Sequence, residues 1–175
     1  LRWETDLGLS KTQLSATFTT ALIVSAFSAP LAGHLIDRGY GRMVLAGSAL
    51  IGGLMVAALV VIDQFGFFFI AWLVLGFAMA GCLYEPCFAF VTRTCGLEAK
   101  RSIMLITLVA GFAGTVSFPT ANIVAEWGGW RSSMAVFSIL ILLVSVPLFL
   151  MGTESKKVYK KSVGTDGKSP RRKAV

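Results

Sequence analysis

Residues 102–125 read SIMLITLVAGFAGTVSFPTANIVA, a run of 24 residues without a charged side chain between Arg101 and Glu126. At about 1.5 Å of rise per residue, a helix of about 20 residues crosses the 30 Å hydrocarbon core of a membrane. A helix also satisfies its backbone hydrogen-bonding groups internally, which the hydrocarbon requires. The run therefore predicts a transmembrane helix.

Four further uncharged runs have similar lengths, at residues 12–36, 43–62, 64–84 and 132–153. The third is expected to continue past Glu85 to about Thr92. The sequence thus predicts an all-α membrane protein with five transmembrane helices, at about residues 13–36, 43–62, 67–92, 102–125 and 132–152. Residues 1–152 would form a helix bundle. Residues 153–175 would form a basic, disordered cytoplasmic tail or a linker between two halves of a longer protein.

The composition excludes an ordinary soluble domain. Hydrophobic residues make up 55% of the 175 residues and charged residues only 14%, with a mean hydropathy of +0.76, whereas charged residues supply about a quarter of a typical soluble domain. One histidine, and one acid within the predicted spans, leave too few groups for a catalytic triad or a metal site. We therefore expect no enzyme activity and no cofactor.

The basic residues divide unequally between the two predicted sides of the membrane. Thirteen of the 16 lie in residues 37–42, 93–101 and 153–175, and three lie in the segments on the other side. Because cytoplasmic segments are enriched in Lys and Arg, the N-terminus is predicted outside and the C-terminus in the cytoplasm. The net charge of +7 does not indicate nucleic-acid binding, since eight basic residues lie in the last 20 positions without a series of interleaved aromatic residues.

Residues 33–45 read GHLIDRGYGRMVL, at the end of the first predicted span and the loop after it. The segment resembles the signature G-x-L-A-D-R-x-G-R-K-x-x-L of the major facilitator superfamily. Agreement without a gap covers Gly33, Leu35, Asp37, Arg38, Arg42 and Leu45, whereas Tyr40 and Gly41 depart from the pattern. Gly129-Trp130-Arg131 before the last predicted span is also usual in that family.

The resemblance implies a secondary transporter with two six-helix halves around a central site, which opens alternately to each side. Residues 1–152 would correspond to family helices two to six, so the first helix and the C-terminal half would be missing partners. The other implied partners are the lipid bilayer, a small-molecule substrate, and a proton or a counter-solute. Tyr84-Glu85-Pro86 resembles bacterial carriers of carboxylates and other metabolites, which favours an organic anion or another metabolite and a location in the bacterial inner membrane. The alternative is a non-transporting membrane protein that acts through its helices or tail.

Two groups of charged residues are candidates for function. Gly33, Asp37, Arg38 and Arg42 would form a cytoplasmic gate, with Gly33 allowing close contact with a neighbouring helix. Glu85 is a carboxylate inside a predicted span, which costs about 2.5–3.5 kcal/mol on insertion scales. It would act in the gate or in helix pairing with Arg38, Arg93 or Arg101, or else in proton coupling or substrate contact.

Polar side chains gather in the first and fourth predicted spans, which should therefore face a cavity or other helices. Thr20, Ser28, Thr115 and Asn122 are the candidate cavity residues. For Asn122, a hydrogen bond between helices is an equal alternative to a cavity contact. Glu126 and Arg131 are expected to pair at the outer surface.

Overall fold

The computed structural model describes residues 10–95 and 99–152, and these residues are helical almost throughout. The elements are α2 (Lys11–Leu35), the π-helical turn η1 (Ile36–Tyr40), α3 (Gly41–Leu59), α4 (Phe65–Cys82), α5 (Tyr84–Cys95), α6 (Ala99–Leu140), η3 (Ile141–Ser145) and α7 (Val146–Gly152). The predicted all-α class is confirmed. The predicted basic tail, residues 153–175, lies outside the described residues.

The first helix begins at a reciprocal cap. The Ser10 hydroxyl accepts a hydrogen bond from the Gln13 backbone N–H at 3.2 Å, and the Gln13 side-chain oxygen accepts one from the Ser10 N–H at 2.9 Å. Two N–H groups that the first turn would leave free are thereby satisfied. The cap places the start of α2 at Lys11.

Three helical runs in the described residues are long and apolar enough to cross a membrane: Lys11–Leu59, Phe65–Thr94 and Ala99–Met151. The first and third are 49 and 53 residues long, more than twice the 20 or so residues that one crossing needs. Each contains one glycine with non-helical torsion angles, Gly39 or Gly129. Five membrane helices were predicted, whereas the structure has three long helical runs. The numbers differ because the helix continues directly before and after each of these two glycine turns.

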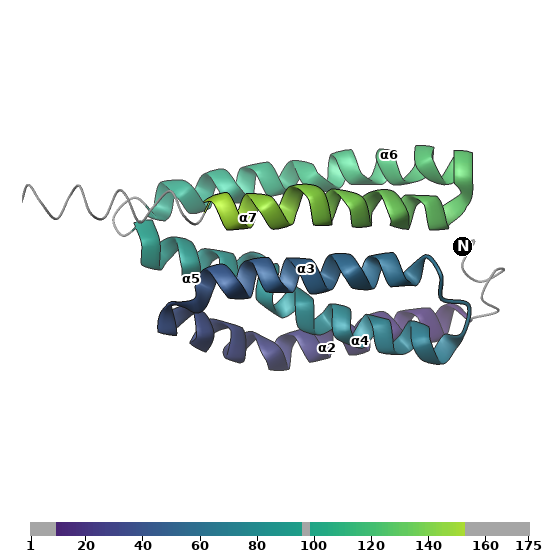
Figure 1. The fold of residues 1–175 in the computed structure, drawn as a ribbon, viewed down its shortest axis with the longest axis horizontal. Helices are drawn as coiled ribbons and strands as arrows, with labels where there is room; N and C mark the ends of the chain where they lie inside the picture. Colours follow the sequence, from purple (N-terminus) through teal and green to yellow (C-terminus); the bar gives the residue numbers. More distant parts are fainter. Residues whose placement is uncertain (1–9, 96–98, 153–175) are drawn as a thin grey trace, which may run out of the picture.

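At both glycines the chain reverses direction, once at each end of the molecule (Figure 1). We call residues 99–128 the first arm of α6. The second arm consists of residues 130–152, which also include η3 and α7. The end of the molecule that holds η1 is the η1 end.

The second run is interrupted where a single helix over residues 67–92 was predicted. Leu83 has an extended backbone (ψ −168°), so α4 stops at Cys82 and α5 starts at Tyr84. Pro86 accounts for the break, because a proline lacks the N–H that would bond the carbonyl four residues earlier, and its ring collides with that carbonyl.

Helix α4 lies between α2 and α3 and makes the most extensive contacts of the bundle with both. At Gly76 the approach to α2 is closest, since a Cβ atom there would lie 2.3 Å from the Ala21 carbonyl oxygen. A small core of Leu59, Phe68, Ala71 and Leu75 fills the α3–α4 contact. The second arm packs on α3, where the buried Ser138 hydroxyl donates to the Gly53 carbonyl at 3.0 Å.

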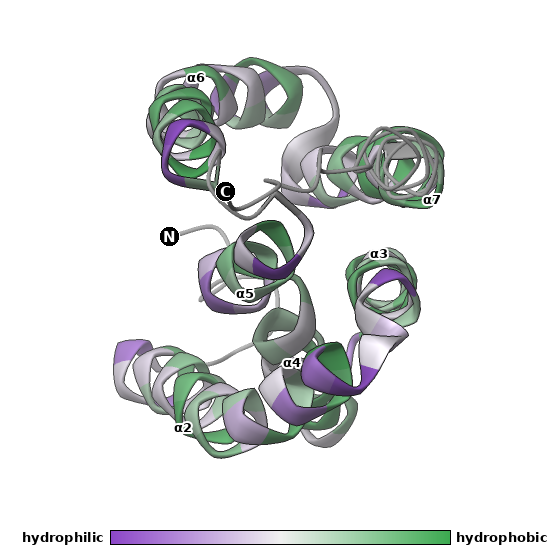
Figure 2. Cartoon of the chain, turned by 90° about the vertical axis from the view of Figure 1, so that its left-hand side faces the viewer, coloured by the Kyte–Doolittle hydropathy of each residue, from purple (hydrophilic) through white to green (hydrophobic). Residues whose placement is uncertain are grey.

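The outer surface of the bundle is apolar. In the most hydrophobic stretch of the third run, only 6% of the residues are buried within the molecule. Phe118 and Trp127, both on the first arm, are 80% and 89% exposed. In Figure 2, green and pale colours predominate along the helices. A surface of this kind is stable in hydrocarbon rather than in water.

Candidate functional site

The turn at the η1 end depends on one glycine. Gly39 has φ +97°, in a region that residues with a Cβ atom rarely adopt. Its torsion angles reverse the chain between α2 and α3 and place Asp37 and Arg38 at the tip, where both are exposed. The predicted acid and its neighbouring base thus lie together at one end of the bundle.

The start of α3 is pressed against α5. Gly41 is buried, and a Cβ atom there would lie 2.5 Å from a ring carbon of Phe90. The departure from the family pattern at position 41 therefore has a steric reason, because a lysine or arginine would require the aromatic ring to move. Arg42 follows at once and is half-buried.

A long-range hydrogen bond fixes α5 to this turn. The Nη1 atom of Arg93 donates to the backbone carbonyl of Ile36 at 3.2 Å, across 57 residues of sequence. Ile36 is almost fully buried, so the guanidinium binds at the base of the turn. The structure thus brings Arg93 to the turn that holds Asp37 and Arg38, and the predicted charge network among them stays a prediction.

The family follows from a comparison with known proteins. Residues 2–174 match the family model of the Major Facilitator Superfamily. The chain belongs to the Major Facilitator Superfamily. No curated protein and no solved structure matches the chain. The predicted resemblance is confirmed, and with it the membrane class, since the members of this superfamily are membrane transporters.

In this superfamily chain, Glu85 lies in the first turn of α5 and is exposed. Its carboxylate is therefore next to the positive end of the helix dipole, which stabilises a negative charge. Glu85 precedes Arg93 by eight residues, about 12 Å along a helix. Among the described residues Glu85 has no ion-pair partner within 4 Å, so pairing with Arg38, Arg93 or Arg101 is absent from this conformation.

Arg101 is exposed on the first turn of α6. This turn and the end of α5 lie at the η1 end, as Figure 1 shows. Lys100 is exposed beside Arg101, so the η1 end carries basic residues from three helices. The chain thus brings Arg93 and Arg101 to the end of the bundle that holds the predicted gate segment.

Within the described residues, Gly33 does not make the close helix contact that the sequence predicts. A Cβ atom at Gly33 would have no described atom within 4 Å, leaving aside its own helix backbone and adjacent residues. Among the described residues, a glycine of α4 makes such a contact with α2 instead, Gly76 opposite the Ala21 carbonyl, and the role predicted for Gly33 stays a prediction. A small residue permits close packing of two helices, but its presence in a sequence does not show which helix it meets.

Several threonine hydroxyls on α2 and the first arm of α6 bind their own helix, and Thr20 is the candidate cavity residue among them. The Thr20 hydroxyl donates to the Ala16 carbonyl at 2.7 Å, and Thr107 and Thr120 make equivalent bonds four residues back. Such bonds satisfy the donor without water. Each oxygen keeps its capacity to accept a hydrogen bond, so these threonines present acceptors rather than donors.

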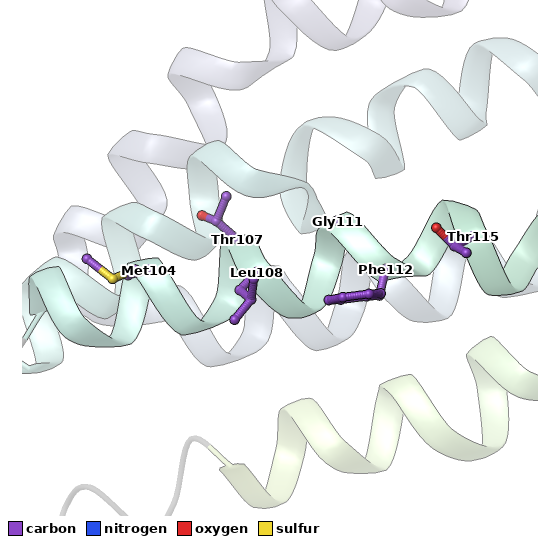
Figure 3. A pocket seen from close by; sticks show the side chains of 6 residues that line it. All are labelled: Met104, Thr107, Leu108, Gly111, Phe112 and Thr115. Carbon is purple, nitrogen blue, oxygen red and sulfur yellow. The ribbon is translucent and has the colours of Figure 1, made fainter.

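A hollow lined by Met104, Thr107, Leu108, Gly111, Phe112 and Thr115 lies along the first arm of α6 (Figure 3). All of its described lining residues belong to that one helix, so the hollow is a single wall rather than a closed pocket. Thr115, a predicted cavity residue, is exposed at one end of this wall.

The remaining two cavity candidates lie elsewhere. The side-chain amide of Asn122 donates to the Glu126 carboxylate at 3.3 Å, one turn along the same helix. Ser28 lines a different hollow, between α2, α3 and α4. The four candidates therefore do not converge on one enclosed site within the described residues.

Arg131 makes a cluster that sequence reasoning missed. The sequence indicates a pair with Glu126, but Arg131 forms an ion pair with Asp63 and donates from Nη1 to the Val60 carbonyl at 2.9 Å. Its guanidinium also lies 5.0 Å from the ring centroid of the buried Trp130. Glu126 cannot compete, because it precedes the chain reversal at Gly129 and binds Asn122.

Among residues 10–95 and 99–152, no group of three His, Cys, Asp or Glu side chains is arranged to hold a metal ion. Apart from Glu85, the charged side chains of the described residues lie toward the two ends of the bundle, and its middle is apolar with scattered hydroxyls. This distribution is typical of a protein that crosses a membrane.

Proposed function

We propose that the chain forms part of a secondary transporter that moves a small solute across a membrane by alternating access. The observation that carries this proposal is the family match over residues 2–174, together with the contact of Arg93 with Ile36 at the signature turn. A turn held by one charged hydrogen bond to a carbonyl can release and re-form, and a gate requires such a contact.

The proposal includes five membrane crossings. The chain reversals at Gly39 and Gly129 divide the first and third helical runs into two segments each. Helices α2 and α3, with 25 and 19 residues, and the two arms of α6 each have the length of one crossing. The fifth crossing is α4 with α5, joined at Leu83.

We propose that the η1 end faces the cytoplasm of a bacterial cell. The described basic residues at that end are Arg38, Arg42, Arg93, Lys100 and Arg101, whereas the opposite end has Lys11 and Arg131. This asymmetry supports the orientation by the positive-inside rule. The C-terminal tail would then be cytoplasmic, and the N-terminus would lie outside.

We propose that the described residues form one side of the transport path. The superfamily architecture places six helices in each half around a central site, and this chain would supply helices two to six of the first half. We propose that the first arm of α6 lines this path, because most of its side chains are exposed. Its exposed polar groups include the hydroxyls of Thr107 and Thr115. An organic anion or another small metabolite is the proposed substrate class.

Glu85 is the proposed coupling group. Its carboxylate begins a helix at a break within a crossing, and such breaks form ion sites in other secondary transporters. A proton is the proposed coupling ion, because a carboxylate within a crossing is costly and is found there mainly where it has a function. A counter-solute is the alternative coupling partner.

A ligand screen by thermal unfolding tests the proposal. The transporter that contains this chain is purified in detergent, and its Tm is measured with a panel of small carboxylates and other metabolites. Because a ligand stabilises the state that it binds, a substrate should raise the Tm in a concentration-dependent manner. Thr115→Val should reduce the shift, and Ser132→Ala, near the end of the bundle, should not.

Gradient-driven flux of the same compound into proteoliposomes completes the test. We expect saturable uptake that depends on a pH gradient. In Glu85→Gln, uptake should no longer depend on that gradient. If no compound shifts the Tm and none is transported, a non-transporting membrane protein that acts through its helices or tail is the correct reading.

A further inference from the structure

A groove of about 350 Å³ lies between α2, α3 and the end of α4. Its described lining residues come only from α2, η1, α3 and α4, and none comes from α5 or α6. The groove therefore opens on the face away from the first arm of α6. Its volume is within the range of small-molecule sites, roughly 300–1,000 Å³.

The length of the groove matches one leaflet of a bilayer. The lining extends from Tyr40, the last residue of η1, along α3 to Ile51, eleven residues further on. Eleven residues correspond to about 16 Å of helix, and half of the hydrocarbon thickness is about 15 Å. On α2 the lining extends from Leu35 back to Ser28. The groove thus runs from the membrane surface at the η1 end to the middle of the bilayer.

No described residue of this chain fills the groove at Gly47. A Cβ atom at Gly47, which lines it, would have no described atom within 4 Å. Met43 and Phe77 flank the groove and are 73% and 46% exposed. Apolar side chains beside a void lack dispersion contacts on one side. A flexible hydrocarbon chain in the void would supply these contacts.

The turn next to the mouth of the groove carries more basic than acidic residues, since Arg38 and Arg42 flank the lining residue Tyr40. Tyr40 lines it at the η1 end and is 55% exposed. Arg38, two residues before Tyr40, is exposed in the same turn, and Arg93 is held on Ile36 close by. The one acid in this turn is Asp37, so basic groups are in excess where a lipid headgroup would lie.

We propose that this groove binds an acyl chain of an anionic phospholipid from the leaflet at the η1 end, with the lipid phosphate at Arg38. The apolar lining fits the chain and the basic turn fits the phosphate. A helix from a second copy would fill the apolar groove equally well, but it would gain nothing from the arginine at the mouth. The proposal rests on the membrane class of the chain and not on the proposed transport function.

Photolabelling in nanodiscs tests the proposal. The probe is phosphatidylglycerol with a diazirine on one acyl chain, and phosphatidylcholine with the same chain is the comparison. After illumination, peptide mass spectrometry locates the label. We expect labelling to concentrate on residues 43–51 of α3 and around Phe77, above the level on the first arm of α6, which is equally apolar.

Two variants and one control make the test specific. Gly47→Leu fills the groove with a side chain and should lower labelling of residues 43–51 at least about fivefold, since a chain that cannot enter loses its buried contacts. Arg38→Gln should lower labelling by phosphatidylglycerol about fivefold, because one basic residue near an anionic surface contributes about that factor. It should lower labelling by phosphatidylcholine less, because the choline cation offsets the charge of the phosphate. Gly66→Leu is the matched control, because a Cβ there also has no described atom within 4 Å.

Equal labelling by the two lipids, or labelling of residues 43–51 that Gly47→Leu leaves unchanged, would overturn the proposal. Covalent dimers formed through a cysteine placed at Met43 would also overturn it, because they would show a second copy in the groove. Unfolding of each variant in detergent is compared with that of the unaltered chain, and Gly47→Ala replaces Gly47→Leu if the larger side chain prevents folding.

Discussion

Arg131 and Asp63, 68 residues apart in the sequence, form an ion pair at the end of the bundle opposite η1. The same guanidinium donates to the carbonyl of Val60, and thereby fixes the α3–α4 loop to the turn at Gly129. At the other end, Arg93 makes the corresponding bond to the carbonyl of Ile36. Each end of the bundle is thus held by an arginine that reaches a distant backbone carbonyl.

Arg131→Ala should lower the free energy of unfolding in detergent by about 1–3 kcal/mol, because the Val60 carbonyl and the Asp63 carboxylate both lose a charged donor. Asp63→Asn should cost less than about 1 kcal/mol, since its carboxylate is mostly exposed and exposed ion pairs contribute little. Glu126→Gln is the control and should change stability by less than about 0.5 kcal/mol. A loss for Asp63→Asn as large as that for Arg131→Ala would contradict this account.

Gly39→Ala should lower the unfolding free energy by about 1–2 kcal/mol, because alanine is strained at φ +97° even where space is available. Gly47→Ala is the matched control inside α3, also with no described atom within 4 Å of the new Cβ. There alanine should stabilise by about 0.5–1 kcal/mol, because it has the higher helix propensity. Chemical unfolding of both variants in the same detergent gives the comparison, and the same sign for both would count against the turn geometry.

Gly76→Ala should destabilise the bundle by about 1–3 kcal/mol, because the added methyl group would overlap the Ala21 carbonyl, a backbone atom that cannot rotate away. Gly66→Ala, at the other end of the same helix, has open space and should be close to neutral. Thermal unfolding of the two variants checks the difference. A neutral Gly76→Ala would show that α2 and α4 are further apart than described.

Reporter fusions test the five proposed crossings and their orientation. A reporter that is active only in the cytoplasm should be active after Tyr40 and inactive after Gln64, since the intervening helix α3 would place the two points on opposite sides of the membrane. A fusion after Gly128 should be inactive as well. The opposite pattern, or equal activity at Tyr40 and Gln64, would overturn the proposed topology.

The fold class followed directly from the sequence, because an uncharged run of about 20 residues is a strong signal with one physical cause. The position of the signature turn followed as well, since Gly39 and the charged residues around it mark the end of an apolar run. The break at Leu83 was not predicted, although Pro86 was present as a signal. Charge spacing measures the length of an apolar run but does not detect an interruption inside it.

Tertiary partners were harder to predict. Arg131 was expected to bind Glu126 because the two are close in sequence, but the chain reversal at Gly129 directs it to Asp63 instead. The threonine hydroxyls were expected to face a cavity, yet a carbonyl four residues back satisfies Thr20 within its own helix. One sequence gives no information about which of several small residues meets a neighbouring helix, and Gly76 rather than Gly33 does so here.

We propose that the turn at Asp37 is a gate and not a part of the substrate site. The most direct measurement compares substrate affinity with transport rate for Asp37→Asn in the transporter that contains this chain, with Glu126→Gln as the control. The account predicts that transport falls by at least about tenfold, the effect of about 1.4 kcal/mol on the equilibrium between the two open states, while equilibrium binding in detergent stays within a factor of about two. Affinity that falls in parallel with transport would place Asp37 in the substrate site and contradict the gate.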